Sequence, residues 1–154
     1  MSEVSNLNKR IKELEQILNK YKTIDLKLEN IEDRMNVLVE DIKMVGVSYE
    51  QKGSPTNAFN SNVENEVIRR AEQNSEKLAS LIKVKNELFL FKNVVYRALS
   101  TLEKTELDII TMRYLHKDKK SWVEIGMTLG FEKDYCCKKR NSILTKLEPM
   151  LVDI

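Results

Sequence analysis

The chain reads SWVEIGMTLGFEKDYCCKKR over residues 121–140, and this stretch decides the fold of the C-terminal part. Its first four residues, Ser121–Glu124, have the S-x-x-E spacing of a capping box and predict that a helix begins there. The apolar spacing gives this helix one buried stripe, made by Trp122, Ile125 and Leu129. Gly130 stands where a left-handed residue ends a helix, and Phe131 is expected to fold back onto the last turn. We therefore expect a short helix over residues 122–129.

Gly126 lies in the middle of that helix, although glycine costs about 1 kcal/mol in a helix interior. We expect another helix to cross at this point, where a side chain would hold it away. That helix is predicted from about Lys133 to Leu147, and Pro149 follows its end. Its inward residues are expected to be Cys136, Ile143, Leu144 and Leu147.

A further short helix is expected before this pair. Thr105–Asp108 reads TELD, an N-cap signal with acidic residues, and predicts a helix from Glu106 to about Tyr114. A basic connector, LHKDKK, follows it. Residues 133–147 carry five basic side chains against one acidic one, a balance of +4, which makes them the densest basic segment of the chain. A short helix, a glycine-bearing turn and a basic helix are typical of a helix-turn-helix, whose second helix lies in the major groove of DNA.

An apolar heptad repeat in the N-terminal part predicts a coiled coil. Its positions are Leu7, Ile11, Leu14, Leu18, Tyr21, Ile24, Leu28, Ile31, Met35, Leu38, Ile42 and Val45. The three-residue step from Tyr21 to Ile24 predicts a stammer, a local overwinding of one continuous helix. A second stripe, from about Val67 to Leu99 and including Ile82, follows a loop expected over residues 47–62. At 1.5 Å per residue, each helix would be about 60 Å long.

Two helices of matching length joined by one loop predict a long antiparallel helical hairpin over residues 1–100. A small helix-turn-helix domain over residues 101–154 completes an all-α fold. A lone two-helix hairpin buries little apolar surface, so we expect a homodimer that forms through the hairpin. The alternative, in which the stripes pack only within one chain, stays open. Asn36, Asn74 and Lys85 lie near the seams and are candidates for fixing the register.

The composition favours few, long helices and a soluble protein. The 154 residues include only four glycines and two prolines, with 32% charged and 42% hydrophobic residues. The net charge of +2 excludes a polycation that coats nucleic acid, so a nucleic-acid site must be local. No apolar run is long enough to span a membrane, and the N-terminus lacks a signal peptide, which indicates a cytoplasmic protein.

Nothing in the sequence indicates an enzyme. It contains no phosphate loop, no nucleophile arrangement and no metal-ligand spacing, so we expect no cofactor and no metal. His116 stands alone in a charged connector and is expected to be solvated. The adjacent Cys136 and Cys137 close no useful loop and indicate a reducing compartment. Cys136 is expected in the core and Cys137 at the surface.

The C-terminal third resembles region four of bacterial sigma factors, the domain that reads promoters. The resemblance rests on LEKTELDIITMRY at residues 102–114 and on SWVEIGMTLGFEKDYCCKKRNSILTKL at residues 121–147, in that order. It does not extend before residue 100, where a sigma factor would have an aromatic-rich, core-binding domain. A helical N-terminal part joined to a sigma-like C-terminus is similar to phage transcriptional regulators of the RinA and ArpU type.

That resemblance implies a sequence-specific DNA-binding transcriptional regulator, a late-gene activator of a phage or prophage in a bacterial host cell. Its partners would be double-stranded promoter or operator DNA and, as a further candidate, RNA polymerase. Two alternatives stay open. A small terminase subunit for DNA packaging also joins a helix-turn-helix to a helical oligomerisation hairpin. A sigma-like adaptor would bind RNA polymerase and hardly touch DNA.

The resemblance also implies where DNA contacts fall. Base contacts are expected early in the recognition helix, at Lys133, Asp134, Tyr135, Cys137, Lys138 and Asn141. Lys138 has the chemistry to reach guanine, Asn141 to pair with adenine, and Asp134 to accept from cytosine. Phosphate contacts are expected from Lys119, Lys120, Ser121, Trp122, Lys139 and Arg140. Glu132 and Lys139 depart from the family pattern, which leaves the start and the rotation of this helix open.

Two of these assignments have a structural alternative. Trp122 is expected mainly in the core, with only its indole N–H near the helix start as a phosphate donor. The basic run Lys138–Arg140 is alternatively a solvated helix face without a ligand.

Overall fold

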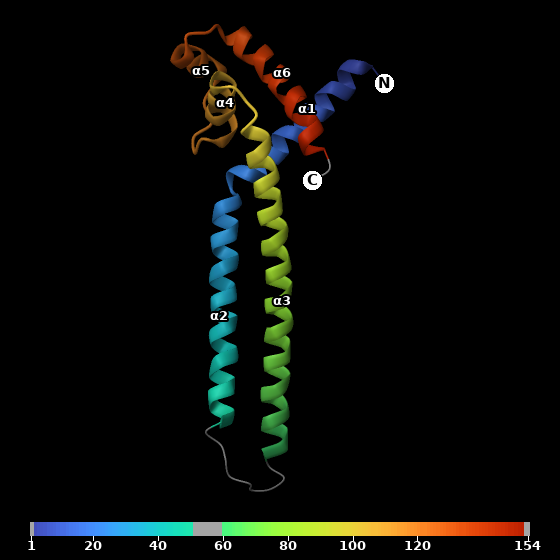
Figure 1. The fold of residues 1–154 in the computed structure, drawn as a ribbon, viewed down its shortest axis with the longest axis vertical. Helices are drawn as coiled ribbons and strands as arrows, with labels where there is room; N and C mark the ends of the chain where they lie inside the picture. The colour runs from blue at the N-terminus through green and yellow to red at the C-terminus, as the bar shows by residue number, and fades with distance from the viewer. Residues whose placement is uncertain (1, 51–59, 153–154) are drawn as a thin grey trace. The chain divides into compact units, whose positions relative to one another are not determined.

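The computed structural model describes residues 2–50 and 60–152, and every regular element in these ranges is helical. The elements are α1 (Glu3–Lys22), α2 (Ile24–Glu50), α3 (Asn60–Leu99), α4 (Lys104–Ile110), η1 (Thr111–Leu115), α5 (Trp122–Leu129) and α6 (Lys133–Leu151) (Figure 1). All are α-helices except η1, which is a π-helix. No strand occurs in the described ranges, so the all-α prediction is confirmed.

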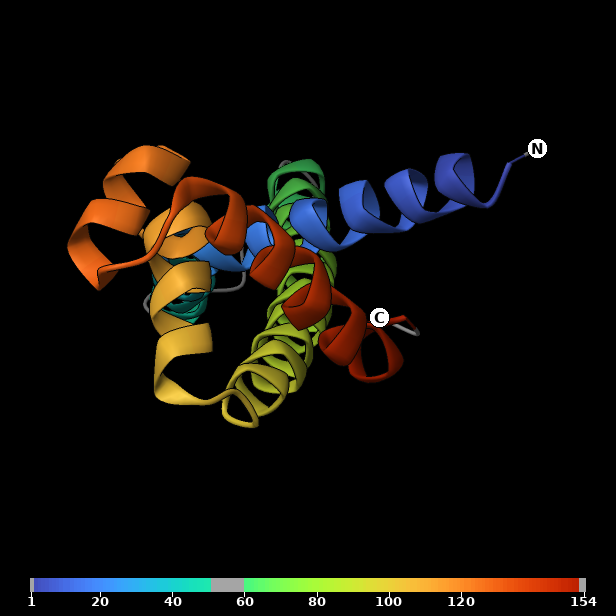
Figure 2. The same cartoon turned by 90° about the horizontal axis from the view of Figure 1, so that it is seen from above.

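The chain divides into two compact units. Unit 1 comprises residues 1–25 and 89–154, and unit 2 comprises residues 26–88. The division expected at residue 100 therefore lies inside unit 1. The physical cause is the packing of α1, which buries Ile11, Leu14 and Leu18 and contacts both η1 and α6 (Figure 2).

The N-terminal helical stretch is broken at Thr23 and not overwound. Thr23 has φ −103° and ψ 7°, and its N–H donates to the carbonyls of Lys20 and Tyr21. The predicted stammer within one continuous helix is therefore wrong. Leu18 and Ile24, on either side of the break, are both fully buried in unit 1. Their burial stabilises a bent path that the heptad repeat alone does not reveal.

Unit 2 consists of the parts of α2 and α3 that lie side by side in opposite directions (Figure 1). The Lys85 Nζ lies 3.5 Å from the Glu32 Oε1 across the pair. Within residues 26–45 and 62–88 of this unit, for which burial is described, only Leu28 and Ile31 are buried. Most other seam positions are half-buried, namely Met35, Leu38, Ile42, Val45, Val67, Ala71, Leu78, Leu81 and Leu88. The expected stripe is thus present but incompletely covered.

Some details of the two long helices differ from the prediction. α2 continues to Glu50 and α3 begins at Asn60, so residues 47–50 and 60–62, which were expected in the loop, are helical. Residues 51–59 lie outside the described ranges. Ile82 was expected in the stripe but is exposed. Of the polar residues near the seam, Asn74 and Lys85 are half-buried, whereas Asn36 is exposed.

The first short helix of the C-terminal part begins earlier than predicted and then changes its winding. Its N-cap is Glu103 and not Thr105. After α4 the chain enters η1, closed by a 2.7 Å hydrogen bond from the His116 N–H to the Thr111 carbonyl. The prediction of one α-helix over residues 106–114 is therefore wrong. Tyr114, within η1, is buried.

α5 begins and ends as predicted. The Ser121 Oγ accepts a hydrogen bond from the Glu124 N–H at 3.2 Å, and the Glu124 carboxylate accepts one from the Ser121 N–H at 2.8 Å. These two bonds complete the capping box. Gly130 ends the helix in the left-handed region with φ 77°. The N–H groups of Gly130 and Phe131 both donate to the Gly126 carbonyl, at 2.8 and 2.9 Å.

α6 begins at Lys133 as predicted but continues past Pro149 to Leu151. The prediction that proline follows the helix end is therefore wrong. Proline in a helix interior costs about 3 kcal/mol because it removes a hydrogen bond and crowds the preceding turn. Leu147 and Leu151, one turn apart around Pro149, are both fully buried, and their burial offsets this cost.

Gly126 fits against the turn that joins α5 to α6. A Cβ on Gly126 would lie 2.5 Å from the Phe131 carbonyl oxygen and 3.5 Å from the Lys133 nitrogen. The close neighbour is thus the backbone of the turn and the first residue of α6, and not the middle of a crossing helix. Because the obstacle is backbone, it cannot move aside as a flexible side chain would.

We expect Gly126→Ala to destabilise unit 1 by about 1–3 kcal/mol, because the clash exceeds the gain of about 1 kcal/mol in helix propensity. Urea unfolding followed by the fluorescence of Trp122, the single tryptophan, measures this unit. Met127→Ala, at an adjacent residue that is 81% exposed, is the control and should change stability by less than about 0.5 kcal/mol. Equal stability of the two variants would contradict the close approach.

Candidate nucleic-acid interface

α6 turns one face to the core of unit 1 and the opposite face to solvent. The buried residues are Cys136, Ile143, Leu144, Leu147 and Leu151, which confirms the predicted inward positions. The predicted base contacts lie elsewhere on the helix, with Lys133, Asp134, Tyr135 and Lys138 exposed and Cys137 and Asn141 half-buried. Asp134 and Lys138, spaced i and i+4, share the outer face, and Asn141 lies at its half-buried edge. The rotation that the sequence left open is thereby fixed.

The two half-buried members of this set differ in what they offer a ligand. Asn141 turns its Oδ1 inward, where no described residue bonds it, so its amide would have to rotate to reach a base edge. Cys137 is a free thiol at the edge of the outer face. Cys136 is a free, buried thiol whose pKa is raised by burial, as expected of a small core residue.

An aromatic pair stands at the start of α6. The rings of Phe131 and Tyr135 have centroids 4.8 Å apart and are tilted by 34°. Both residues are exposed. The Phe131 ring therefore lies against Tyr135 of α6. This contact holds the Tyr135 ring beside the outer face.

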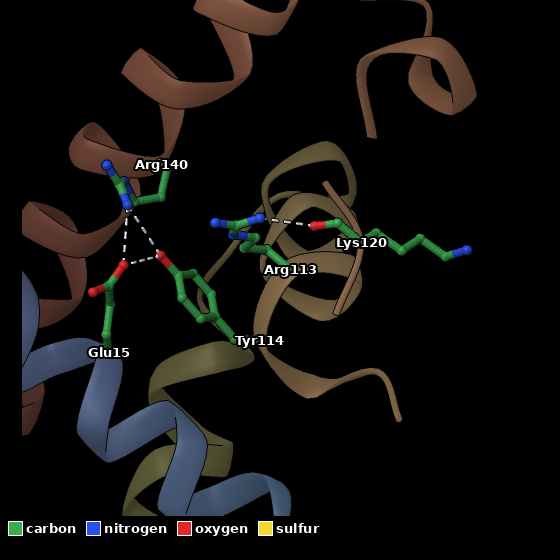
Figure 3. A network of polar contacts seen from close by, with 5 residues as sticks. All are labelled: Glu15, Arg113, Tyr114, Lys120 and Arg140. Atoms are coloured by element: carbon green, nitrogen blue, oxygen red, sulfur yellow. Dashed lines mark hydrogen bonds and ion pairs between the residues drawn. The ribbon is translucent and has the colours of Figure 1, made fainter. Parts of the chain in front are cut away.

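Two guanidinium groups lie near the Trp122 ring. The Arg113 Cζ is 4.5 Å from the centroid of the Trp122 ring, and the Arg140 Cζ is 5.4 Å from it. The Arg113 Nη1 also donates to the Lys120 carbonyl at 2.9 Å (Figure 3). Cation–π contacts of this kind contribute about 0.5–2 kcal/mol each. Trp122 thus joins η1, α5 and α6.

Arg140 takes part in a polar network with α1. Its Nη1 lies 3.0 Å from the Glu15 Oε1, and the Tyr114 hydroxyl donates to that same oxygen at 2.6 Å (Figure 3). The Arg140 Nη1 is also 3.4 Å from the Tyr114 hydroxyl oxygen. Burial raises the pKa of Tyr114 to about 12, and its hydrogen bond to Glu15 acts in the same direction. Sequence reasoning found neither Glu15 nor Arg113, because nothing in the heptad or motif pattern relates them to α6.

Some of the basic side chains in the segment 133–147 form ion pairs with acidic side chains, and others do not. Arg140 pairs with Glu15, and the Lys146 Nζ lies 3.4 Å from the Oε1 of the buried Glu106. Lys133, Lys138 and Lys139 pair with no acidic side chain among the described residues. The positive charge left for a ligand therefore lies on these three lysines of α6.

The connector adds further basic groups next to α5. Lys119 is exposed and Lys120 is half-buried. The Ser121 hydroxyl already caps α5, so as a phosphate contact it would have to donate its own proton. Glu124 completes the cap, and its backbone hydrogen bond from Ser121 lowers the pKa of its carboxylate. His116 is exposed, and its Nδ1 accepts from the Asp118 N–H at 3.2 Å.

The described ranges contain neither a candidate membrane span nor a cluster of metal-ligating side chains. None of their helices combines the length and the apolar character that crossing a bilayer requires. In the same residues, no three His, Cys, Asp or Glu side chains converge as a metal site would require.

The raised pKa of Tyr114 predicts a specific loss of stability in alkali. The ordinary tyrosine pKa is about 10, so the stability that neutral Tyr114 contributes is complete below pH of about 10. It is lost as the pH rises through the folded-state value of about 12. Tyr114→Phe cannot ionise, so it should lose less stability than the wild type between pH of about 9 and 11.5.

Urea unfolding at the two pH values, followed by Trp122 fluorescence, gives this difference. Tyr135→Phe, which changes an exposed tyrosine of α6, is the control and should keep the wild-type pH dependence. If the free energy of unfolding of Tyr114→Phe falls as much as that of the wild type between the two pH values, the ionisation of Tyr114 is not coupled to folding.

We compared the chain with protein-family models, with curated proteins and with solved structures, and none of them matches it. The function proposed below therefore rests on the residues, contacts and charges of the chain itself, together with the motif resemblance.

Proposed function

We propose that this chain is a sequence-specific transcriptional regulator that binds double-stranded DNA through α6. In this proposal α5, the turn at Gly130 and α6 form a helix-turn-helix, with α6 as the recognition helix. The observation that carries the proposal is that Lys133, Lys138 and Lys139, at the start of α6, pair with no acidic side chain among the described residues, and that Lys138 lies on the side of the helix opposite its buried residues. Helix-turn-helix proteins place the N-terminal residues of such a helix at base edges in the major groove.

The chemistry of this face suits a mixture of base and phosphate contacts. Lys138 lies on the outer face without an acidic partner among the described residues and can donate to guanine O6 or N7. Asp134, one turn earlier, can accept from cytosine N4. The exposed Tyr135 ring can contact a thymine methyl group. Lys119 and Lys120, which precede α5, and Lys139, which follows Lys138 on α6, are assigned to phosphates.

Arg140 and Trp122 receive a different role in this proposal. Both were expected to reach phosphates, but the Arg140 guanidinium is bonded to Glu15 and lies over Trp122. We assign them to hold α6 on α1, η1 and α5. The resemblance to sigma region four supports the DNA-binding assignment of the lysines and does not bear on this network.

The biological setting of the proposal rests on the resemblance to RinA- and ArpU-type regulators. It comprises a phage or prophage in a bacterial cytoplasm, promoter DNA, two copies of the chain, and no catalytic activity of its own. Selection of bound fragments from random double-stranded DNA tests sequence specificity directly. A recovered common motif supports the proposal, and recovery of unrelated sequences with equal affinity contradicts it.

A second candidate has its own supporting observation. Val123 and Met127 on α5 are apolar, spaced i, i+4, and 51% and 81% exposed. Such a pair next to the helix-turn-helix suits a protein partner, as in a sigma-like adaptor that binds RNA polymerase. A gel shift on promoter fragments with and without polymerase separates the two, because an adaptor shifts DNA only when polymerase is present.

Lys138→Ala should cost about 1–3 kcal/mol on the selected site and relax the base preference at one position. Lys120→Ala should instead weaken selected and scrambled DNA alike and reduce the salt slope of binding by about one unit. Fluorescence anisotropy at several salt concentrations measures both effects. Lys83→Ala changes an exposed lysine of unit 2 and serves as the control. Equal losses on both DNAs for Lys138→Ala would remove it from the base contacts.

Arg140→Gln should lower the stability of unit 1 by about 1–3 kcal/mol, because it leaves Glu15 and Tyr114 without their cation. Its salt slope for DNA binding should stay at the wild-type value, since no phosphate contact is lost. Urea unfolding and the salt titration read the two quantities separately. A slope reduced by about one unit with unchanged stability would return Arg140 to the phosphate contacts.

A further inference from the structure

An open apolar groove runs between α2 and α3 within unit 2. It has a volume of about 1040 Å³, and its apolar lining comes from Val37 and Leu38 of α2 and from Leu81 and Val84 of α3. Val37 is 61% exposed and Val84 is 42% exposed. Neither belongs to the heptad seam, so the groove widens the apolar surface to one side of it.

The two helices do not close a core of their own around this groove. Apart from Leu28 and Ile31 at one end, no residue of unit 2 is buried over 26–45 and 62–88, the ranges in which side-chain burial is described. The apolar seam positions of both helices remain half-buried along the unit. A helix pair with this pattern needs a further layer to cover its apolar side.

We propose that a second copy of the chain supplies this layer, with its groove packed against the first groove in a four-helix bundle. The proposal rests on the proposed function only in that a regulator with two half-sites requires two copies. It goes further by naming the face through which they pair.

The charges around the groove fit a second copy. Its exposed rim carries Asp33 and Arg34 on α2 and Glu76 and Lys77 on α3. Each helix thus places one acidic residue beside one basic residue, and the four charges cancel. A two-fold axis through the groove can bring opposite charges together from either helix, so self-association meets no net repulsion.

Other occupants suit the groove less well. A nucleic acid requires a net positive surface, which this balanced rim lacks. A small molecule is usually enclosed over most of its surface, whereas this groove is open along its side.

The size of the face also matches a stable dimer. At 1.5 Å per residue, the paired parts of α2 and α3 extend for about 40 Å, and two helices side by side are about 20 Å wide. One face of unit 2 therefore offers about 800 Å² per copy, which is the usual contribution of one partner to a stable interface.

Light scattering on the full chain without DNA tests the proposal, with a chain mass of 18.0 kDa as the reference. The wild type should have twice this mass. The variant Val37→Asp with Val84→Asp should have the single-chain mass, because it places carboxylates inside the interface. The control, Leu26→Asp with Ile82→Asp, changes two residues of the same helices with matched exposures of 60% and 42% that do not line the groove. It should keep the double mass.

A charge exchange keeps the test valid even if the apolar variants unfold. Arg34→Glu with Lys77→Glu makes all four rim residues acidic, and Asp33→Lys with Glu76→Lys makes all four basic. All four positions are exposed, so the helices should remain folded by circular dichroism. Each variant alone should be single-chain, and an equimolar mixture should recover the double mass.

A wild type of single-chain mass would overturn the proposal and leave the groove to a different partner. A ring-sized mass would also overturn it and favour a packaging subunit. Three other results would place the interface elsewhere. They are a single-chain mass for the control variant, a double mass for the groove variant, and a double mass for either charge variant measured alone. Light scattering measures the mass without DNA, so it tests the dimer separately from DNA binding. The anisotropy assay on the same samples tests DNA binding.

Discussion

The position of α6 depends on the contact between Gly126 and the backbone of the turn. The Phe131 carbonyl oxygen occupies the place that a side chain at residue 126 would need. Only glycine at this position allows the chain to return so closely after α5, and the left-handed Gly130 supplies the change of direction. The Gly126 carbonyl then accepts the N–H groups of both Gly130 and Phe131, so the turn has little freedom. The rotation of α6, and with it the set of outward residues, follows from this constraint.

A second set of contacts, made by basic side chains of α6 itself, holds this helix against the rest of unit 1 along its length. Arg140 bonds Glu15 of α1 and lies over Trp122, and Lys146 bonds the buried Glu106. A basic helix is therefore not a uniform positive surface. Arg140 and Lys146 are paired within unit 1, whereas Lys133, Lys138 and Lys139 pair with no acidic side chain among the described residues. This division is the physical basis for separating the residues that we propose to bind DNA from the residues that position the helix.

Unit 2 differs from unit 1 in that much of its apolar surface remains uncovered. Its seam residues are only half-buried, and Val37 and Val84 extend the apolar surface to one side. Burial of such surface contributes roughly 25 cal/mol per Å², so an incompletely covered helix pair is weakly stabilised alone. In the four-helix arrangement that we propose, the same exposed positions become the interface that joins two copies.

The sequence by itself determined the local features whose causes lie within a few residues. The capping box at Ser121, the left-handed Gly130, the start of α6 at Lys133 and the inward face beginning with Cys136 all follow from short-range backbone chemistry and helical period. Only the tertiary structure decided the break at Thr23, the continuation of α6 through Pro149 and the partners of Arg140. In each of these cases, packing between segments distant in sequence offsets a local cost or supplies a partner. A heptad repeat indicates that a helix has an apolar face. Which element covers that face depends on tertiary contacts that form only when the chain folds.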